Sequence, residues 1–240
     1  VWITGLVICG FLALIIFGGV KRIGKVAQIV VPFMAEAYII MAIIIMAMNF
    51  TEIPGVIKLI ITSAFNAEAT FGGIFGMAIS WGIKRGIYSN EAGQGTAPHA
   101  AAAAEVSHPV KQGLVQAFSV YVDTLFICTA TAFMILFTGQ YNVINPEGGF
   151  LVENLPGVTY GPEFTQYAIS EHFPNLGAGF IAISLAFFAF TTIMAYYYIA
   201  ETNLSFLQKD QHRDWPLFAL RALIIIATFY GTVRTAELAW

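Results

Sequence analysis

The sequence predicts an all-α membrane protein that crosses the bilayer several times. Of its 240 residues, 58% are hydrophobic and only 10% are charged, whereas soluble domains carry about 25% charged residues. The mean hydropathy is +0.75, and the apolar residues gather in runs of about 20, the length that an α-helix needs to cross the hydrocarbon core. A soluble domain of this length could not bury so much apolar surface. Lys and Arg are few and form no stripe, so no nucleic-acid binding is predicted.

About six apolar segments are predicted to cross the membrane. They are 1–19, 26–48, 71–97, 113–138, 177–200 and 215–238. The third is irregular, because it contains Lys84, Arg85 and a polar stretch. In the sixth, Arg221 and Arg234 lie near enough to the ends for their charged groups to reach the interface.

The loops between these segments alternate in charge. Cytoplasmic loops are enriched in Lys and Arg. Six basic residues lie in three of the loops, which are 20–25, 98–112 and 201–214. The loops 49–70 and 139–176 carry only Lys58. The alternation holds only if segment 71–97 crosses the membrane, and it predicts that 20–25 is cytoplasmic and 139–176 lies outside.

The long outer loop 139–176 is acidic and contains two short apolar runs. The runs FLVENL and EFTQYAISEHF predict short helices over the outer face. These helices either form a lid over a pathway or belong to a plain surface loop.

The most informative feature is the polar stretch Gly86–Ala104, GIYSNEAGQGTAPHAAAAA. Unpaired backbone groups in hydrocarbon cost several kcal/mol, so a helix is broken there only where it lines a protein-buried or watered cavity. In transporters, substrates and coupling ions bind at such breaks. The candidate substrate-binding residues are therefore Ser89, Asn90, Glu91, Gly93, Gln94 and Gly95. The alternative is a cytoplasmic loop followed by an amphipathic helix.

The residues of this stretch predict a helix, an unwound linker and a second helix. Residues that tolerate turns or positive φ come first, namely Ser89, Asn90, Gly93 and Gly95. Thr96 is placed to cap the second helix, and Pro98 suits its first turn. Free N–H groups at the start of that helix favour a carboxylate. Glu91 either holds the unwound backbone or faces cytoplasmic water.

Two other segments carry polar groups within the predicted membrane. Asp123 shares a helix face with Gln116 and Ser119; this face either conducts an ion or proton or forms interhelical hydrogen bonds. Thr191 and Thr192 lie in the middle of a segment. Their hydroxyls either ligate Na⁺ or donate to carbonyls of their own helix.

Several other residues have simpler interpretations. The tyrosines 196–198 are predicted to mark the inner membrane interface, with Glu201 just beyond. Glu36 lies deep enough in its segment to need a partner. Cys9 and Cys128 fall in separate apolar runs, which indicates neither a disulfide nor a metal pair.

The motif Arg85–Ala104 resembles the signature of the alanine/glycine:cation symporter family, also called the sodium:alanine symporters. That signature is similar to RG-[IF]-[FY]-SNEAG-x-G-[ST]-AP-x-AAAAA, and here it reads RGIYSNEAGQGTAPHAAAAA. The stretches Gly18–Met34 and Val122–Phe133 also resemble the family. The family is similar to LeuT-type transporters, which contain two inverted repeats of five helices.

The resemblance implies that the chain holds the end of core helix 4 and then core helices 5 to 9. The chain begins at Val1 inside one apolar run and ends at Trp240 after another. We therefore interpret 1–240 as a single transmembrane domain and an internal fragment, lacking the first core helices and the last. The broken core helix matches 71–104, and its unwound linker is either Ser80–Gly86 or lies near Asn90.

The resemblance also implies a function. We expect import of a small neutral amino acid, alanine or glycine, coupled to Na⁺ and driven by alternating access across a bacterial-type plasma membrane. Paired hydroxyls in core helix 8 of such proteins hold sodium and match Thr191 and Thr192. No other cofactor is expected. The alternatives are a proton-coupled transporter that uses Asp123 or Glu91, and a channel; an enzyme is not expected, because no metal-ligand spacing or Ser–His pair lies within the segments.

Overall fold

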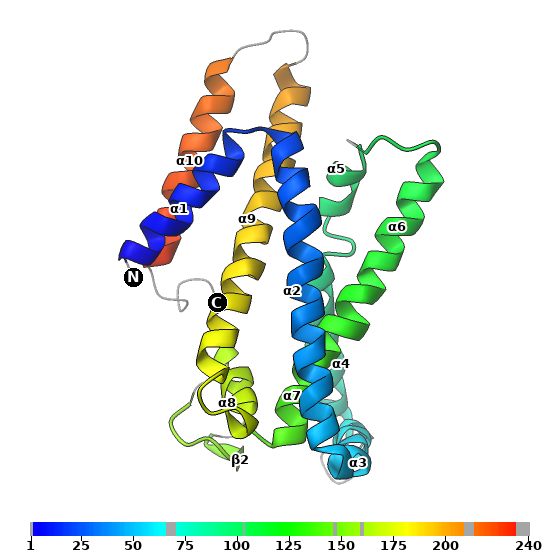
Figure 1. Ribbon diagram of the computed structural model, residues 1–240. Coiled ribbons are helices and arrows are strands. Elements are labelled where there is room, and N and C mark those ends of the chain that lie inside the picture. Colours follow the sequence, from blue (N-terminus) through cyan, green and yellow to red (C-terminus); the bar gives the residue numbers. More distant parts are fainter. Residues whose placement is uncertain are drawn as a thin grey trace. The chain divides into compact units, whose positions relative to one another are not determined.

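The computed structural model describes residues 2–65, 71–102, 104–145, 148–158, 161–208 and 214–233, and the chain is mostly helical (Figure 1). It divides into two compact units. The first unit comprises Val1–Met34, Thr96–Ser107 and Leu185–Trp240, and the second comprises Ala35–Gly95 and His108–Ser184. The prediction of one transmembrane domain over 1–240 stays a prediction.

Among its described residues, the first unit contains five helices, two of which continue into the second unit. They are α1 (Trp2–Ile16), α2 (Val20–Met48), α5 (Thr96–Ala102), α9 (Gly177–Gln208) and α10 (Asp214–Val233). Helix α1 lies along α10 (Figure 1). The buried core of the unit is formed by Leu12, Ile16, Ile23, Met194 and Tyr197. Gly5 allows α1 to pack closely against α10, because a Cβ there would meet the side chain of Thr232.

The turn between α1 and α2 is shorter than the sequence predicts. The expected loop 20–25 is wrong, because α2 is already helical from Val20. The chain reverses at Gly19, whose φ of +75° is the left-handed conformation that glycine adopts readily. Arg22 donates from Nη1 to the carbonyl oxygen of Leu14 at 2.7 Å. A basic residue of the expected loop thus satisfies an open carbonyl at the end of α1.

The second unit contains most of the shorter elements. They are the 3₁₀ turn η1 (Phe50–Glu52), α3 (Ile53–Phe65), α4 (Phe71–Asn90), α6 (Pro109–Tyr121), the π-helix η2 (Val122–Cys128), α7 (Thr129–Thr138), β1 (Asn142–Ile144), β2 (Phe150–Glu153) and α8 (Pro162–His172). The α6, η2 and α7 elements follow one another without a gap. His108 caps this run by accepting from the backbone N–H of Val110 at 3.2 Å.

The loop 139–176 contains one of its two predicted helices. EFTQYAISEHF lies in α8, which confirms that prediction. FLVENL is not helical, because β2 pairs antiparallel with β1 and Asn142 lies opposite Glu153. Asn142 also donates from Nδ2 to the carbonyl oxygen of Leu155 at 2.7 Å and accepts from the Leu155 N–H at 2.8 Å. Pairing with a distant segment therefore overrides the local preference.

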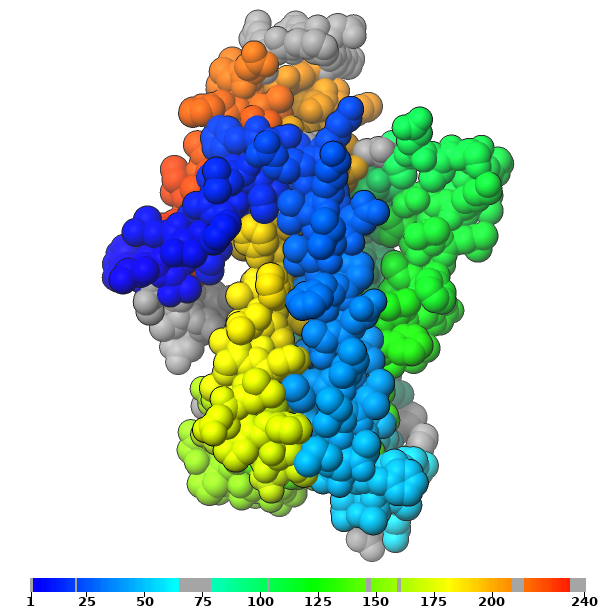
Figure 2. Space-filling view, viewed as in Figure 1, coloured from blue at the N-terminus to red at the C-terminus, as the bar shows by residue number. Residues whose placement is uncertain are grey.

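Among the described residues, four helices are long and apolar enough to cross a membrane. They are Lys21–Met48, Pro109–Thr138, Gly177–Gln208 and Asp214–Val233. The chain is therefore a polytopic membrane protein. The α2 surface, which is blue in Figure 2, exposes large apolar side chains that include Ile29, Phe33, Ile40 and Ile43.

The six expected crossings and the LeuT-type arrangement stay predictions. Helix α1 has 15 residues, fewer than the roughly 20 that a spanning helix needs. Helix α4 has 20 residues, but Lys84 and Arg85 near its end lower its hydropathy. The predicted loop 201–214 is partly wrong, because α9 continues to Gln208. Lys209, Arg213, Arg234 and Glu147 lie outside the described residues.

Candidate functional site

The helix break predicted from the polar stretch lies at Glu91–Gly95. Helix α4 ends at Asn90 and α5 begins at Thr96. Three residues of the break have positive φ: Glu91 at 55°, Gly93 at 84° and Gly95 at 89°. The alternative linker Ser80–Gly86 is wrong, because that segment is helical. Gly93 and Gly95 adopt the positive φ that the sequence predicts for them. The sequence does not predict a positive φ for Glu91.

Ser89 and Asn90 belong to the last turn of α4 and not to the unwound linker, which corrects the sequence prediction. The backbone of this turn stays bonded: the Glu91 N–H donates to the carbonyl oxygen of Ile87 at 2.9 Å. The amide of Gln94 donates to the same oxygen at 3.0 Å. The break therefore folds back onto the end of α4.

Asn90 connects the break to a second helix. Its Oδ1 accepts from the backbone N–H of Ala92 at 2.9 Å, and its Nδ2 donates to Oγ1 of Thr124 in η2 at 2.8 Å. One amide side chain therefore bonds both to the unwound backbone and to the neighbouring helix.

Ser89 makes the second contact with η2. Its Oγ donates to Oδ2 of Asp123 at 2.7 Å and lies 3.2 Å from Sγ of Cys128. Cys128 is itself 3.8 Å from the same carboxylate oxygen. Asp123 therefore contacts α4, as an intramembrane acid that needs a partner should. Ser119, predicted to share its face, instead donates to the carbonyl oxygen of Gln116 in its own helix at 2.7 Å.

The basic residues before the break contact an aromatic ring. Nζ of Lys84 and Cζ of Arg85 each lie 5.4 Å from the centre of the Trp81 ring. These are cation–π contacts. The sequence analysis did not consider Trp81 as a partner of the two basic residues.

Thr191 and Thr192 lie in the part of α9 that belongs to the first unit. Thr191 Oγ1 donates to the carbonyl oxygens of Phe187 and Phe188 at 2.9 and 3.0 Å. Thr192 Oγ1 donates to that of Phe188 at 2.8 Å. Both hydroxyls thus form the bonds expected of threonine in a membrane helix. A hydroxyl oxygen that donates still has lone pairs for a cation, so the predicted sodium role stays a prediction.

A charged cluster in the first unit was missed by the sequence analysis. Arg221 donates from Nε to the hydroxyl of Tyr197 at 2.9 Å and pairs with Glu201 at 3.4 Å. Tyr197 is fully buried and Glu201 is 8% exposed. Tyr197 is therefore buried against its neighbours and Arg221 is bonded within the unit, and the membrane-interface positions expected for both stay predictions. Opposite charges on two successive segments were the signal that could have found this pair.

The short helix α5 is held to α9 within the first unit. Nδ2 of Asn203 lies 3.2 Å from Nδ1 of His99 and donates to the carbonyl oxygen of Ile199 at 2.8 Å. The chain passes from the second unit to the first between Gly95 and Thr96. The break therefore lies in the second unit, directly before this boundary in the chain.

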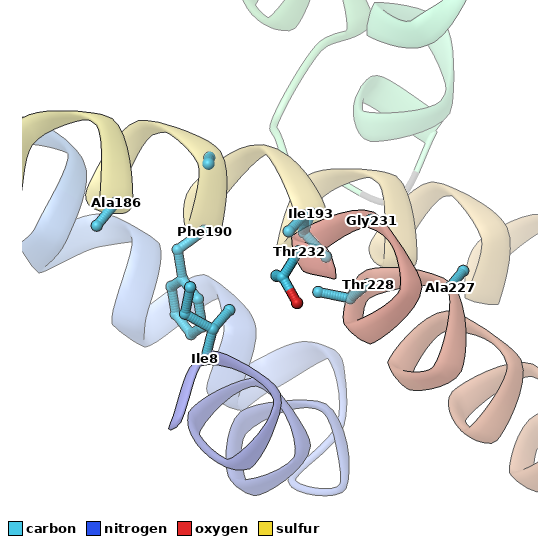
Figure 3. A pocket seen from close by; sticks show the side chains of 9 residues that line it. Ile8, Ala186, Phe190, Ile193, Ala227, Thr228, Gly231 and Thr232 are labelled. Carbon is cyan, nitrogen blue, oxygen red and sulfur yellow. The ribbon is translucent and has the colours of Figure 1, made fainter. Parts of the chain in front are cut away.

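A cavity of about 410 Å³ lies among α1, α9 and α10 (Figure 3). Its lining is apolar apart from two hydroxyls, and it comprises Ile8, Ala186, Ala189, Phe190, Ile193, Ala227, Thr228, Gly231 and Thr232. The Thr232 hydroxyl donates to the carbonyl oxygen of Phe229 at 2.7 Å. None of the predicted site residues lines this cavity.

Comparison with known proteins decides the family. The whole chain, residues 1–240, matches the model of the sodium:alanine symporter family. The chain belongs to this family. This confirms the resemblance found in the sequence and the prediction of a transporter and not an enzyme.

The relatives agree with this assignment. The chain is 63% identical over 239 residues to a putative sodium/proton-dependent alanine carrier protein of Bacillus subtilis, covering 100% of this chain and 49% of that protein. It is 59% identical over 239 residues to the sodium/proton-dependent alanine carrier protein of Bacillus sp. PS3, covering 99% and 54%. The sodium/alanine symporter AgcS of Methanococcus maripaludis is 36% identical over 240 residues, covering 99% and 49%. The chain thus spans about half the length of these relatives.

Proposed function

We propose that this symporter chain serves the import of a small neutral amino acid, alanine or glycine, together with Na⁺. The break at Glu91–Gly95 carries this proposal, because it is an unwound segment between helices in a chain of the sodium:alanine symporter family. Transporters bind substrate and coupling ions at such segments. The printed names of the relatives, alanine carriers and a sodium/alanine symporter, support alanine and sodium.

The amino acid would bind at Ser89, Asn90, Glu91, Gly93, Gln94 and Gly95. Within the part of the chain that the structure describes, the N–H groups of Gly93 and Gly95 form no hydrogen bond. Donors of this kind suit a carboxylate. The two glycines have no side chain that would keep a small substrate from the backbone, which supports alanine or glycine over a larger amino acid.

The coupling ion would bind at Thr191 and Thr192. Hydroxyl oxygens are hard ligands of the type that small cations take. The two hydroxyl protons point to carbonyls of α9, which leaves oxygen lone pairs for Na⁺. We further propose a LeuT-type arrangement with alternating access, in the plasma membrane.

Coupling to protons is the second candidate. Two of the relatives are named sodium/proton-dependent alanine carrier proteins, one of them as putative. Asp123 is the acid that favours it, since its carboxylate is bonded at 2.7 Å to Ser89, one residue before the last residue of α4. Glu91, in the break itself, is the other candidate carrier.

Radiolabelled alanine uptake into proteoliposomes tests the proposal. The full-length protein is given an inward Na⁺ gradient, a K⁺ gradient or a pH gradient. We expect uptake with Na⁺ and its loss in Thr192→Val. The matched control is Thr202→Val, since Thr202 donates to the Tyr198 carbonyl oxygen of the same helix at 2.9 Å. Uptake driven by pH without Na⁺ would move the coupling role to Asp123 or Glu91, and no uptake under any gradient would contradict the substrate.

A further inference from the structure

One turn of the long helical run Pro109–Thr138 is not α-helical. The segment Val122–Cys128 is the π-helix η2, a rare geometry that occurs frequently at functional sites. Thr129 supports it, since its hydroxyl donates to the carbonyl oxygen of Thr124, five residues earlier, at 3.2 Å. This geometry changes the directions in which the side chains of η2 point.

The π-helix gathers two side chains around one hydroxyl. Residues five apart, such as Asp123 and Cys128, would point about 140° apart around an α-helix of 3.6 residues per turn. In η2 their side chains meet, with 3.8 Å between Sγ and Oδ2. Both also reach Oγ of Ser89, at 2.7 Å from Asp123 and 3.2 Å from Cys128. The π-helix therefore contacts the last turn of α4 through Ser89.

A second contact, between Thr124 and Asn90, connects η2 to the break. Oγ1 of Thr124 accepts from Nδ2 of Asn90 at 2.8 Å, and Oδ1 of the same amide accepts from the Ala92 N–H at 2.9 Å. Because an amide is planar, the bond on one side fixes the direction of the other. Thr124 thereby orients the oxygen that holds the unwound backbone.

The break needs such support. Glu91 has a φ of 55°, a left-handed conformation that is unfavourable for a residue with a Cβ. Strained backbone of this kind persists only where its surroundings hold it, and it clusters at ligand sites. The two bonds from η2 lie one and two residues before Glu91 in the sequence.

We propose that η2 is the positioning element of the break. Asp123 and Thr124 act through Ser89 and Asn90 to keep the backbone of Glu91–Gly95 in the geometry that receives the amino acid. They are positioning residues and do not themselves touch the substrate. This inference rests on the proposed function, because it takes the break to be the amino-acid site.

An engineered disulfide tests the contact without any transport assay. In the full-length protein in membranes, with cysteines outside this chain replaced, Ser89→Cys is oxidised with copper phenanthroline and the linked peptide with Cys128 is sought by mass spectrometry. We expect a reducible bond, because the atoms concerned are 3.2 Å apart. The control Ser80→Cys, about 13 Å earlier along α4, should form none. Absence of the bond in Ser89→Cys would overturn the contact.

Uptake kinetics test the positioning role. Thr124→Val removes the acceptor at nearly the same volume, and we expect it to raise the KM for alanine by about five- to tenfold while the maximal rate stays within about twofold. Thr124→Ser, which keeps the hydroxyl, should restore the wild-type KM. Thr138→Val is the control, since Thr138 donates to the carbonyl oxygen of Met134 in its own helix at 2.8 Å.

The outcomes separate the two proposals. If the wild type transports and the disulfide forms, but Thr124→Val behaves like Thr138→Val, the positioning role is overturned and the proposed function stands. If the wild type takes up no amino acid under any gradient, the proposed function fails and substrate positioning fails with it. The disulfide would then still establish or overturn the bond between η2 and α4.

Discussion

The two polar clusters of the chain differ in charge, in burial and in the helices that carry them. In the first unit, the half-buried Arg221 contacts the buried Glu201 and Tyr197 between the regular helices α9 and α10. In the second unit, hydrogen bonds join the end of the broken helix α4 to a π-helix, and Ser89 there is exposed. A buried ion pair between regular helices fixes their register, whereas an open cluster on irregular backbone leaves groups free for a ligand. We therefore infer a structural role for the first cluster and propose that the second positions the break for a ligand.

The largest expected effect comes from breaking the buried ion pair. Arg221→Met leaves the carboxylate of Glu201 buried without its partner, and removing one member of such a pair costs about 3–5 kcal/mol. We expect a large fall in the melting temperature of the purified protein. Lys25→Met, an exposed charge in the same unit, should change it little. An Arg221→Met protein as stable as Lys25→Met would contradict the structural role.

A smaller effect is expected where helices of the first unit pack closely. A Cβ at Gly5 would contact the hydroxyl of Thr232 and lie 3.4 Å from its Cβ, whereas a Cβ at Gly82 in α4 meets nothing within 4 Å. Gly5→Ala should destabilise the protein by about 1–3 kcal/mol through overpacking. Gly82→Ala should be neutral or stabilising, because alanine favours helix. Thermal denaturation of both variants measures the difference in stability. Equal stability of Gly5→Ala and Gly82→Ala would contradict close packing at Gly5.

The smallest effect on stability is expected in the break. Substitutions there should reduce transport more than they reduce stability. Gly93 has a φ of 84°, and a left-handed residue with a Cβ is less stable by about 1–2 kcal/mol. Gly93→Ala should therefore lower the melting temperature only slightly but reduce alanine uptake strongly. Gly86→Ala, at a helical position with nothing within 4 Å of the added Cβ, serves as the control. Normal uptake by Gly93→Ala would argue against a binding role for the break.

The sequence predicts features that depend on local chemistry. The glycines of the break, the long apolar helices and α8 follow from conformational preference and hydropathy, and all are present. The end of α4 at Asn90 could not be placed in this way, because Ser89 and Asn90 bond to residues 34 positions away.

Three of the missed features depend on distant partners or on a change of helix type. The pairing of Arg221 was missed because its partners Tyr197 and Glu201 lie 24 and 20 positions before it. The π-helix gives no signal in the sequence pattern, since a polar pair within an apolar run, as in VDTLFIC, does not distinguish a π-helix from an α-helix. The strand Phe150–Glu153 depends on pairing with β1.

The central claim, that the amino acid binds at the break, is tested most directly by equilibrium binding. Radiolabelled alanine is titrated onto the purified full-length protein in saturating Na⁺, as the wild type and as Asn90→Ala. The matched control is Asn154→Ala, since Asn154 is exposed and its amide donates to the Gly139 carbonyl oxygen in the loop 139–176. We expect Asn90→Ala to raise the Kd for alanine by about tenfold or more, because the variant loses bonds to Thr124 and to the Ala92 N–H. Equally tight alanine binding by the wild type and Asn90→Ala would contradict it.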